Sequence, residues 1–572
     1  MDWQRTIILG AIAIVSVVLI NEWGDFQERN KPVISQETTV SQATTASADT
    51  TTSVPELGET ATAAASPSDI PVSREEQMAA EQDVTSNTGE LISVKTDALE
   101  FLIDPHGGDI VKAALPQYLE YIDTPDQPFI LLNRTQSNTY VAQSGLIGTN
   151  ATDTAAGRPV FQSAQTAYEL ADGEDILNVD LTYQQGQVVI TKRFIFTRGD
   201  HLVKLEYRIN NQSDKDWKAG LFAQIKRDSH NPVVVDGFGM KPYLGAALTT
   251  PDTNYKKLDF DDLADEDLTS VGGFKVTQTG GWVAMVQHYF LSAWVPDQTQ
   301  ENHFNLRKGK GDIYLMGFTS PQQTVAAGSE GVLSASFYAG PKNIDRLEKI
   351  APYLDLTVDY GWLWWIAKPL FHFLDFIHSI LGSWGWSIIA LTIIIKAAFF
   401  KLSATSYRSM AKMRKFAPEM ARMKELYGDD RQRMSQEMMK LYKKEKINPL
   451  SGCLPILVQM PVFISLYWVL MESVELRHTP FLWWIQDLSV KDPLFILPIV
   501  MGITMFIQQK LNPTPPDPTQ ARIMQMMPFV FTFMFLWFPA GLVVYWVVNN
   551  TLSIAQQYVI TKRIEAGDVK TA

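Results

Sequence analysis

The stretch SIIALTIIIKAAFFKLS, from Ser387 to Ser403, is apolar enough to enter a lipid bilayer, yet it contains Lys396. A lysine near the centre of a membrane span costs about 2.5 to 3.5 kcal/mol even on the milder insertion scale. Such a lysine therefore either extends its side chain to the membrane surface or serves a function inside the protein. The stretch alone leaves both interpretations open.

The two halves of the chain carry opposite charge. Residues 24–360 have a net charge of −20, whereas residues 361–572 have a net charge of +8. This asymmetry is expected when the halves face different compartments, not when one basic surface binds nucleic acid. The chain has one cysteine, Cys453, so no intramolecular disulfide can form, and we interpret this thiol as a small packing residue.

The chain begins with an apolar segment, MDWQRTIILGAIAIVSVVLINEW, residues 1–23. A cleaved signal peptide is one interpretation, but no small-residue cleavage pattern follows. Trp3 and Trp23 lie far enough apart to mark the two membrane interfaces. We therefore expect an uncleaved anchor, with the N-terminus inside. Residues 24–90 are rich in Ser, Thr, Ala and Pro, which predicts a disordered tether.

Residues 91–345 show the alternation of a half-buried β-strand many times over. Val203, Leu205 and Tyr207, for example, alternate with charged residues. Many such runs, separated by turn residues, predict a large antiparallel β-sandwich. Its five histidines lack metal-ligand spacing, so we expect no metal site and no catalysis there, although a sugar-binding cleft is compatible with the fold class.

Residues 361–380 are rich in aromatic residues and carry one polar stripe, formed by Lys368, His372, Asp375 and Ser379 at helical spacing. This pattern predicts an amphipathic helix that lies in the membrane interface.

Five apolar stretches follow, and with the N-terminal anchor they predict six spans. The last two belong to one run, residues 523–560, which as a single helix would be about 57 Å long against a bilayer core of about 30 Å. The turn FPAG, Phe538 to Gly541, allows this run to fold back. The predicted core spans are residues 383–402, 449–471, 493–511, 523–538 and 542–562.

Loop charges predict the orientation. Residues 401–448 carry 13 basic and 6 acidic residues, against 2 and 4 in residues 472–493. The positive-inside rule then places the basic loop and the tail, residues 563–572, in the cytoplasm, with the β-sandwich and its tether outside.

The cytoplasmic loop, residues 403–448, reads as a helical hairpin with methionines at three- and four-residue spacings on either side of YGDD. These methionines form either the hairpin's own core or an adaptable surface for apolar partners. They are Met410, Met413, Met420, Met423, Met434 and Met438.

Several spans contain polar residues that a simple anchor would not need. Each alone could be a hydrogen bond between helices, but together with a lysine they suggest an internal polar cavity. These residues are Thr392, Lys396, Gln459, Thr504, Gln508, Tyr545, Asn549, Ser553 and Gln556. A polytopic transporter or channel is the alternative, although no internal repeat supports it.

Long motifs in this chain resemble the YidC/Oxa/Alb family of membrane protein insertases. They include KINPLSGCLPILVQMPVFISLYWVL, FLWFPAGLVVYWVVNN and, in the β region, GGWVAMVQHYFLSAWVP. The resemblance covers essentially the whole chain. It implies an insertase and chaperone of the Gram-negative inner membrane, with a periplasmic β-super-sandwich similar to sugar mutarotases but without an expected enzymatic role.

The resemblance also implies a site. Five core spans would enclose a hydrophilic groove, closed toward the periplasm and open to cytoplasm and lipid, with a basic residue that falls on Lys396, where most relatives carry Arg. Groove residues would be Lys396, Thr392, Gln459, Gln508, Tyr545 and Asn549, with apolar client contacts at Leu466 and Phe533.

The implied partners are nascent membrane proteins, the Sec translocon, the lipid bilayer and the ribosome, which would dock on the hairpin. No nucleotide motif or metal site is apparent, so we expect no cofactor, and client burial would supply the driving force. A sugar-modifying enzyme built on the β region is a rival reading.

Overall fold

The computed structural model describes most of the chain between residues 90 and 565. The described ranges are 90–135, 137–154, 157–231, 242–265, 268–269, 272–427, 430–444, 454–512 and 518–565. The predicted N-terminal anchor, nearly all of the tether, Cys453 and most of the tail lie outside these ranges.

The first half of the described chain forms two β-sheets. One has 11 strands, in the order β14-β17-β18-β11-β5-β4-β3-β2-β1-β7 with β19 beside β11, and the other has nine, in the order β13-β12-β15-β16-β20-β10-β9-β8-β6. Neighbouring strands pair antiparallel, apart from the parallel pair β1 and β7. The predicted large antiparallel β-sandwich is therefore confirmed.

The strands of the larger sheet are β1 (Ile92–Lys95), β2 (Glu100–Asp104), β3 (Asp109–Leu119), β4 (Pro128–Arg134), β5 (Thr139–Ile147), β7 (Ala167–Glu169), β11 (Trp217–Arg227), β14 (Phe274–Thr279), β17 (Glu301–Lys308), β18 (Tyr314–Thr319) and β19 (Gln323–Val325). Those of the smaller sheet are β6 (Gln162–Ser163), β8 (Ile176–Gln185), β9 (Val188–Thr197), β10 (Leu202–Asn211), β12 (Gly245–Leu248), β13 (Lys256–Leu258), β15 (Val283–Val286), β16 (Phe290–Pro296) and β20 (Glu330–Pro341).

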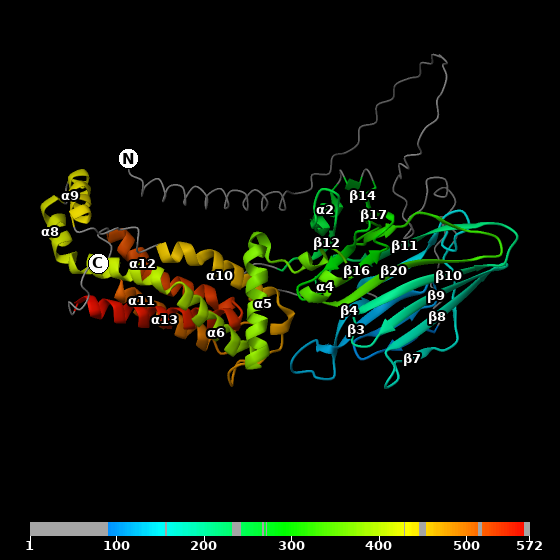
Figure 1. The fold of residues 1–572 in the computed structure, drawn as a ribbon, viewed down its shortest axis with the longest axis horizontal. Coiled ribbons are helices and arrows are strands. Elements are labelled where there is room, and N and C mark those ends of the chain that lie inside the picture. Colours follow the sequence, from blue (N-terminus) through cyan, green and yellow to red (C-terminus); the bar gives the residue numbers. More distant parts are fainter. Residues whose placement is uncertain are drawn as a thin grey trace, which may run out of the picture. The chain divides into compact units, whose positions relative to one another are not determined.

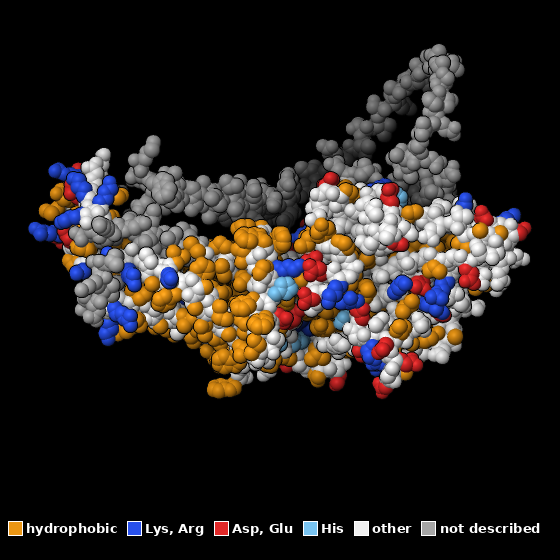
Figure 2. Space-filling model, in the orientation of Figure 1, with side chains coloured by type: hydrophobic (Ala, Val, Ile, Leu, Met, Phe, Trp, Pro, Cys, Tyr) orange, Lys and Arg blue, Asp and Glu red, His pale blue; other side chains and the backbone are white. Residues whose placement is uncertain are grey.

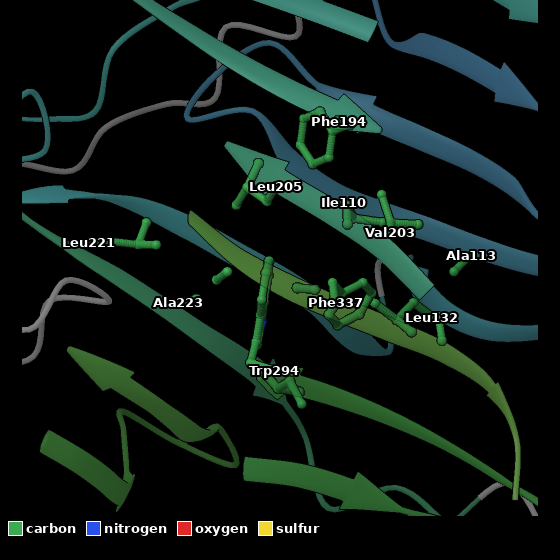
Figure 3. Packing of buried hydrophobic residues seen from close by; sticks show 14 of the residues in the cluster. Ile110, Ala113, Leu132, Phe194, Val203, Leu205, Leu221, Ala223, Trp294 and Phe337 are labelled. Carbon is green, nitrogen blue, oxygen red and sulfur yellow. The ribbon is translucent and has the colours of Figure 1, made fainter. Parts of the chain in front are cut away.

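The core of the sandwich follows from the alternation in the sequence. Val203, Leu205 and Tyr207 on β10 are completely buried, and β10 pairs with β9 on one side and β20 on the other. Figure 3 shows Trp294 and Phe337 among these buried side chains, and their ring centroids are 4.7 Å apart. Burial of such large rings supplies much of the hydrophobic stabilisation of a β-domain.

The second half of the described chain is helical. Its longer helices are α5 (Trp364–Leu381), α6 (Trp384–Ala398), α7 (Phe400–Lys415), α8 (Ala417–Tyr427), α9 (Arg431–Lys444), α10 (Leu454–Glu472), α11 (Ile496–Leu511), α12 (Pro518–Met534) and α13 (Ala540–Glu565). Short elements are α2 (Phe260–Ala264), α4 (Ile344–Ile350) and the 3₁₀ turns Leu354–Thr357, Gly361–Leu363, Val474–Leu476 and Phe535–Trp537.

Helix α13 lies against α6, α7 and α11, and α5 packs across α6 and α10, as Figure 1 shows. Figure 2 shows hydrophobic side chains gathered over this helical region, while the β-sheet region has a mixed surface and Lys and Arg side chains surround α8 and α9. Exposed apolar surface of this extent marks an interaction surface.

Among the described residues, no single helix combines the length and the hydropathy of a membrane span. Helices α6 and α7 together have the length and hydropathy of a span, but a bend of 66° separates them. Shorter apolar helices cover Val458–Glu472, Ile496–Leu511 and Ala521–Trp537. The six-span count therefore stays a prediction.

The structure divides the region around the predicted second span differently from the prediction. Helix α6 ends at Ala398, inside the predicted span, and after the bend α7 runs on to Lys415. Residues 403–415 thus belong to α7, which packs against α13, while α8 and α9 occupy the rest of the predicted hairpin.

Candidate functional site

Lys396 lies on the inward face of α6. Trp384, Ile388, Thr392 and Lys396 follow one another at four-residue spacing, and all four are buried. The opposite face of α6 is exposed and carries Trp386, Ile393 and Ile394. The Lys396 side chain therefore points into the protein and is only 8% exposed.

The charge of Lys396 has no acidic partner in the part of the chain that the structure describes: no carboxylate there forms an ion pair with its ammonium group. Thr392, one turn earlier, donates its hydroxyl to the carbonyl oxygen of Ile388 over 2.7 Å, so its own polarity is satisfied within α6. An ammonium group in such a setting attracts anionic groups strongly, because water screens it poorly.

Helix α10 contributes Gln459, which is half-buried, and Leu466, which is completely buried. Leu466 thus lies inside an apolar cluster in this structure and not on an open surface, and its role as a client contact stays a prediction. Between these two residues, the Phe463 ring stacks on the ring of Tyr545, with centroids 6.0 Å apart.

Helix α13 holds Tyr545, which is buried, and Asn549, which is half-buried. The neighbouring Asn550 donates to the Thr504 hydroxyl of α11 over 3.4 Å, and Gln557 donates to Leu511 and Asn512 at the end of α11. Gln556, which we predicted to line the cavity, donates to the carbonyl oxygen of Phe400 over 3.1 Å.

Sequence reasoning missed Asn550 and Gln557, which lie one position away from the predicted residues Asn549 and Gln556. Spacing alone does not decide which of two adjacent polar residues faces a neighbouring helix. The buried amides of Asn550 and Gln557 bind α13 to α11, the role that we weighed as interhelical hydrogen bonding.

The two remaining predicted residues lie further out. Gln508 is half-buried on α11, and Phe533 on α12 is 58% exposed. Among the described side chains, no hydrogen bond joins Lys396, Gln459 and Gln508 directly. These predicted groove residues thus lie on α6, α10 and α11, the helices around α13, and their described side chains do not form one hydrogen-bond network.

The segment 473–495 packs against the start of α13. The backbone N–H groups of Ala540 and Gly541, the first two residues of α13, donate to the carbonyl oxygens of Val490 and Leu488 over 2.7 and 2.9 Å. A side chain at Gly541 would begin 3.2 Å from the Leu488 carbonyl oxygen, which explains the glycine of FPAG. These contacts fix the segment on the first turn of α13.

Polar contacts also join this segment to its neighbours. Asp492 accepts hydrogen bonds from the Trp484 indole and from the N–H of Leu497 in the first turn of α11. Burial, followed by the nearby Asp375 carboxylate, raises the pKa of Glu475 to about 7, and Asn343 contacts this carboxyl over 3.4 Å.

The methionines of the hairpin lie mainly between its two helices. Met420 is buried, Met434 and Met438 are half-buried, and the Tyr442 hydroxyl lies 3.5 Å from the Met420 sulfur. These contacts favour the hairpin-core interpretation, with the basic residues on the outer faces (Figure 2).

Helix α5 has the amphipathic character that its sequence predicts. Ala367, Phe371 and Leu374 are buried, while Lys368 pairs with Glu348 and Asp355 at 3.1 and 3.0 Å. Its exposed surface carries aromatic and aliphatic side chains beside the polar residues His372, Asp375 and Ser379, as expected at a membrane interface. The exposed large hydrophobic residues in and just before α5 are Trp362, Trp364, Trp365, Phe373, Phe376, Ile380 and Leu381.

Family models match almost the whole described chain. Residues 91–373 match the model described as YidC periplasmic domain, and residues 376–567 match the model described as 60Kd inner membrane protein. A protein of Cellvibrio japonicus named membrane protein insertase YidC is 57% identical, with 100% of both chains covered. Relatives of the same name from Saccharophagus degradans and Pseudomonas fluorescens are 54% and 53% identical, over 99% and 100% of this chain and the whole of each relative.

Solved structures align less closely. The crystal structure of an active YidC insertase aligns with a TM-score of 0.37 and 17% identity, over 83% of this chain and 93% of that chain. A galactose mutarotase-like protein from Lactobacillus casei aligns with a TM-score of 0.29 and 12% identity, over 44% of this chain and 99% of that chain. Both scores are low, and the family assignment does not depend on them.

Proposed function

Because this chain belongs to the YidC family of membrane protein insertases, we propose that it inserts newly made proteins into the inner membrane along the inward face of α6. The family is not an enzyme family, and the protein is an inner-membrane protein with a periplasmic β-domain. The transporter or channel that we considered as an alternative finds no support among the relatives.

The position of Lys396 carries the proposal. Its side chain is buried on the inward face of α6, away from the exposed face that would contact lipid, and no described carboxylate neutralises it. A lysine that merely reached for the membrane surface would lie on the exposed face. An inward, unpaired cation instead suits a pathway for polar or acidic client segments.

The mechanism is physical and not covalent. The polar end of a client enters between α6, α10 and α13 from the cytoplasmic side, which shortens its passage through hydrocarbon. Lys396 attracts acidic residues in that segment, while the apolar span of the client moves out into lipid past exposed side chains such as Phe533. Burial of the client's apolar surface in the bilayer drives the step, and no catalytic group or cofactor takes part.

The finer assignments belong to the same proposal. Both termini lie in the cytoplasm, the Sec translocon serves as a partner for larger clients, and the basic outer faces of α8 and α9 dock the ribosome. The segment 473–495 closes the client pathway toward the periplasm, on the same side as the β-domain.

The proposal is tested by depleting the protein from growing cells and recording which newly synthesised membrane proteins fail to insert. We expect the strongest defects for clients with short, acidic translocated segments, and rescue by the wild-type chain but not by Lys396→Leu. Unchanged insertion of every membrane protein after depletion would refute the proposed function.

A further inference from the structure

A buried ion pair joins the β-domain to the helical region. The Lys342 ammonium lies 2.5 Å from the Glu472 carboxylate, and both side chains are only 2% exposed. Lys342 directly follows the last strand, β20, and Glu472 is the last residue of α10. The pair therefore connects two segments that are 130 residues apart in the sequence, at the point where each element ends.

Further polar contacts join the β-domain to residues on either side of Glu472. A ring nitrogen of His288 lies 2.9 Å from the carbonyl oxygen of Met471, next to Glu472. Arg477 donates to the carbonyl oxygen of Glu120 over 2.9 Å. Its guanidinium also lies 5.6 Å from the ring centroids of Phe129 and Phe290 in the β-domain.

Apolar packing continues across the same junction. Trp282 and Leu347 belong to the same buried cluster as Leu466 and Leu470 of α10. The Trp282 indole donates to the carbonyl oxygen of Pro352, which ties the segment after β20 to the sheet. The junction is thus built like a protein core, and not like a loose contact between domains.

Apolar packing alone would hold such a junction together, because a buried ion pair rarely adds stability over apolar residues of similar size. What the pair adds is direction, since a buried carboxylate is favourable only where a cation reaches it, and Lys342 pairs with Glu472 while the Lys257–Asp359 pair lies nearby. Glu472 ends the helix that carries Gln459, about 20 Å away along its axis. A fixed end therefore fixes where Gln459 and the Phe463–Tyr545 contact lie.

We propose that Lys342 and Glu472 are positioning residues for insertion: they fix the periplasmic end of α10 on the β-domain and so hold the polar pathway in its working geometry. This inference rests on the proposed function. It gives the β-domain a role as a fixed base for one wall of the pathway, without any sugar chemistry.

The test measures position and insertion separately. Spin labels at Val332→Cys in β20 and Val490→Cys in the segment 473–495, both half-exposed sites, report the distance between β-domain and helical region in a Cys453→Ser background. The full chain in lipid nanodiscs is compared as wild type, Lys342→Met, and Lys342→Met with Glu472→Leu. Client insertion is measured for each variant in parallel.

We expect one narrow distance distribution for the wild type and a broader one for both variants, with insertion slowed roughly three- to tenfold. The double variant is decisive, because it removes the pair without leaving a buried charge and so should fold. If it keeps the narrow distance or inserts at the wild-type rate, the pair is only a stabilising contact and the inference is overturned. Arg193→Met, which removes the partly exposed pair with Asp180, is the matched control and should change neither readout.

The two proposals can fail independently. If the wild-type chain itself does not insert the client, the proposed function is wrong. If the wild type inserts and the double variant behaves like it, only the positioning role is lost.

Discussion

Lys396 combines a positive charge with burial on the inward face of α6, and the neighbouring Thr392 is already bonded to its own helix. Among the described residues of this face, Lys396 is therefore the one whose charge has no acidic partner. A guanidinium would keep the charge and add more donors in a planar fork, whereas an alkyl side chain would remove the attraction altogether.

We predict that Lys396→Arg inserts clients normally, while Lys396→Leu folds but inserts an acidic client about tenfold more slowly, because the electrostatic attraction is lost. Lys396→Glu should be worst, since attraction becomes repulsion. The measurement is insertion of one short client and of the same client with its acidic residues neutralised, at matched protein levels.

The neutralised client is the control, and it should depend little on the charge at residue 396. Normal insertion of both clients by Lys396→Leu would show that this charge does not act on clients.

Glu475 provides a prediction about pH. Burial, and then Asp375, raise the pKa of Glu475 from 4.5 to about 7 in the folded protein. Between about pH 4.5 and pH 7, the folded protein therefore keeps a proton on Glu475 that the unfolded chain releases. The contribution of Glu475 to stability therefore falls as pH rises through this window, by at most about 3 kcal/mol. Glu475→Gln, which cannot ionise, should remove the fall.

Hydrogen exchange of residues 473–495 at about pH 5 and about pH 8 measures this effect. In the wild type, exchange corrected for its intrinsic pH dependence should be faster at the higher pH, and in Glu475→Gln this acceleration should be absent. A wild-type segment with equal protection at both values would contradict the assignment.

At the residue scale, sequence patterns located the candidate site only in part. The four-residue spacing of Thr392 and Lys396 was sufficient to place them on one face, but not to say whether that face points inward. That answer depends on the neighbours of α6, which lie far away in the chain. Leu466 illustrates the same limit, because an apolar residue on a span can face lipid or core, and here it is completely buried.

At the scale of elements, the hairpin α8–α9 offers the clearest experiment. Its methionines are largely used in its own packing, so its outer faces are mainly charged. We expect that deletion of residues 417–444, which removes α8 and α9 but keeps α7 on α13, slows insertion, because ribosome and client docking is lost, while protease protection of the other segments is unchanged.

A matched variant sharpens this test of the hairpin. Charge neutralisation of outer residues such as Arg422 and Arg433 should reproduce the defect, while Met439→Leu, at an exposed methionine, should not. Normal insertion by the deletion variant would leave the hairpin without a role in docking.

Element boundaries were predicted best where the sequence itself contains a turn motif or a clear periodic pattern. The turn FPAG marks the start of α13, and the amphipathic stripe marks α5. The bend between α6 and α7 at Phe399 carries neither proline nor glycine, so no local signal could indicate it. Beyond the bend, α7 packs against α13, for example through Gln556 and the Phe400 carbonyl.

At the scale of the whole molecule, the β-sandwich followed from alternation and its family was confirmed, but its strand order could not be derived from alternation. Lys192 shows why: it lies at an inward position of β9, where alternation expects an apolar residue, and it is completely buried. Its ammonium donates to the carbonyl oxygens of Gly107 and Ser144, which are 85 and 48 residues away.

The two parts of the molecule should respond differently to a cavity in the sandwich. Trp294→Ala removes a completely buried ring that packs on Phe337, and we expect it to lower the free energy of unfolding of the β-domain by about 3 to 5 kcal/mol. Hydrogen exchange of the intact protein should accelerate in β10, β16 and β20 but not in α11 and α13. Equal acceleration in those helices would mean that both parts unfold as one unit.

The central claim is that this chain itself inserts membrane proteins along a pathway that contains Lys396. The most direct measurement reconstitutes the purified protein alone into liposomes and follows protease protection of a short acidic client. The account predicts efficient protection with wild type and with Lys396→Arg, and little with Lys396→Leu. Protection that is no greater with the wild-type protein than in empty liposomes, or equal with Lys396→Leu, would contradict it.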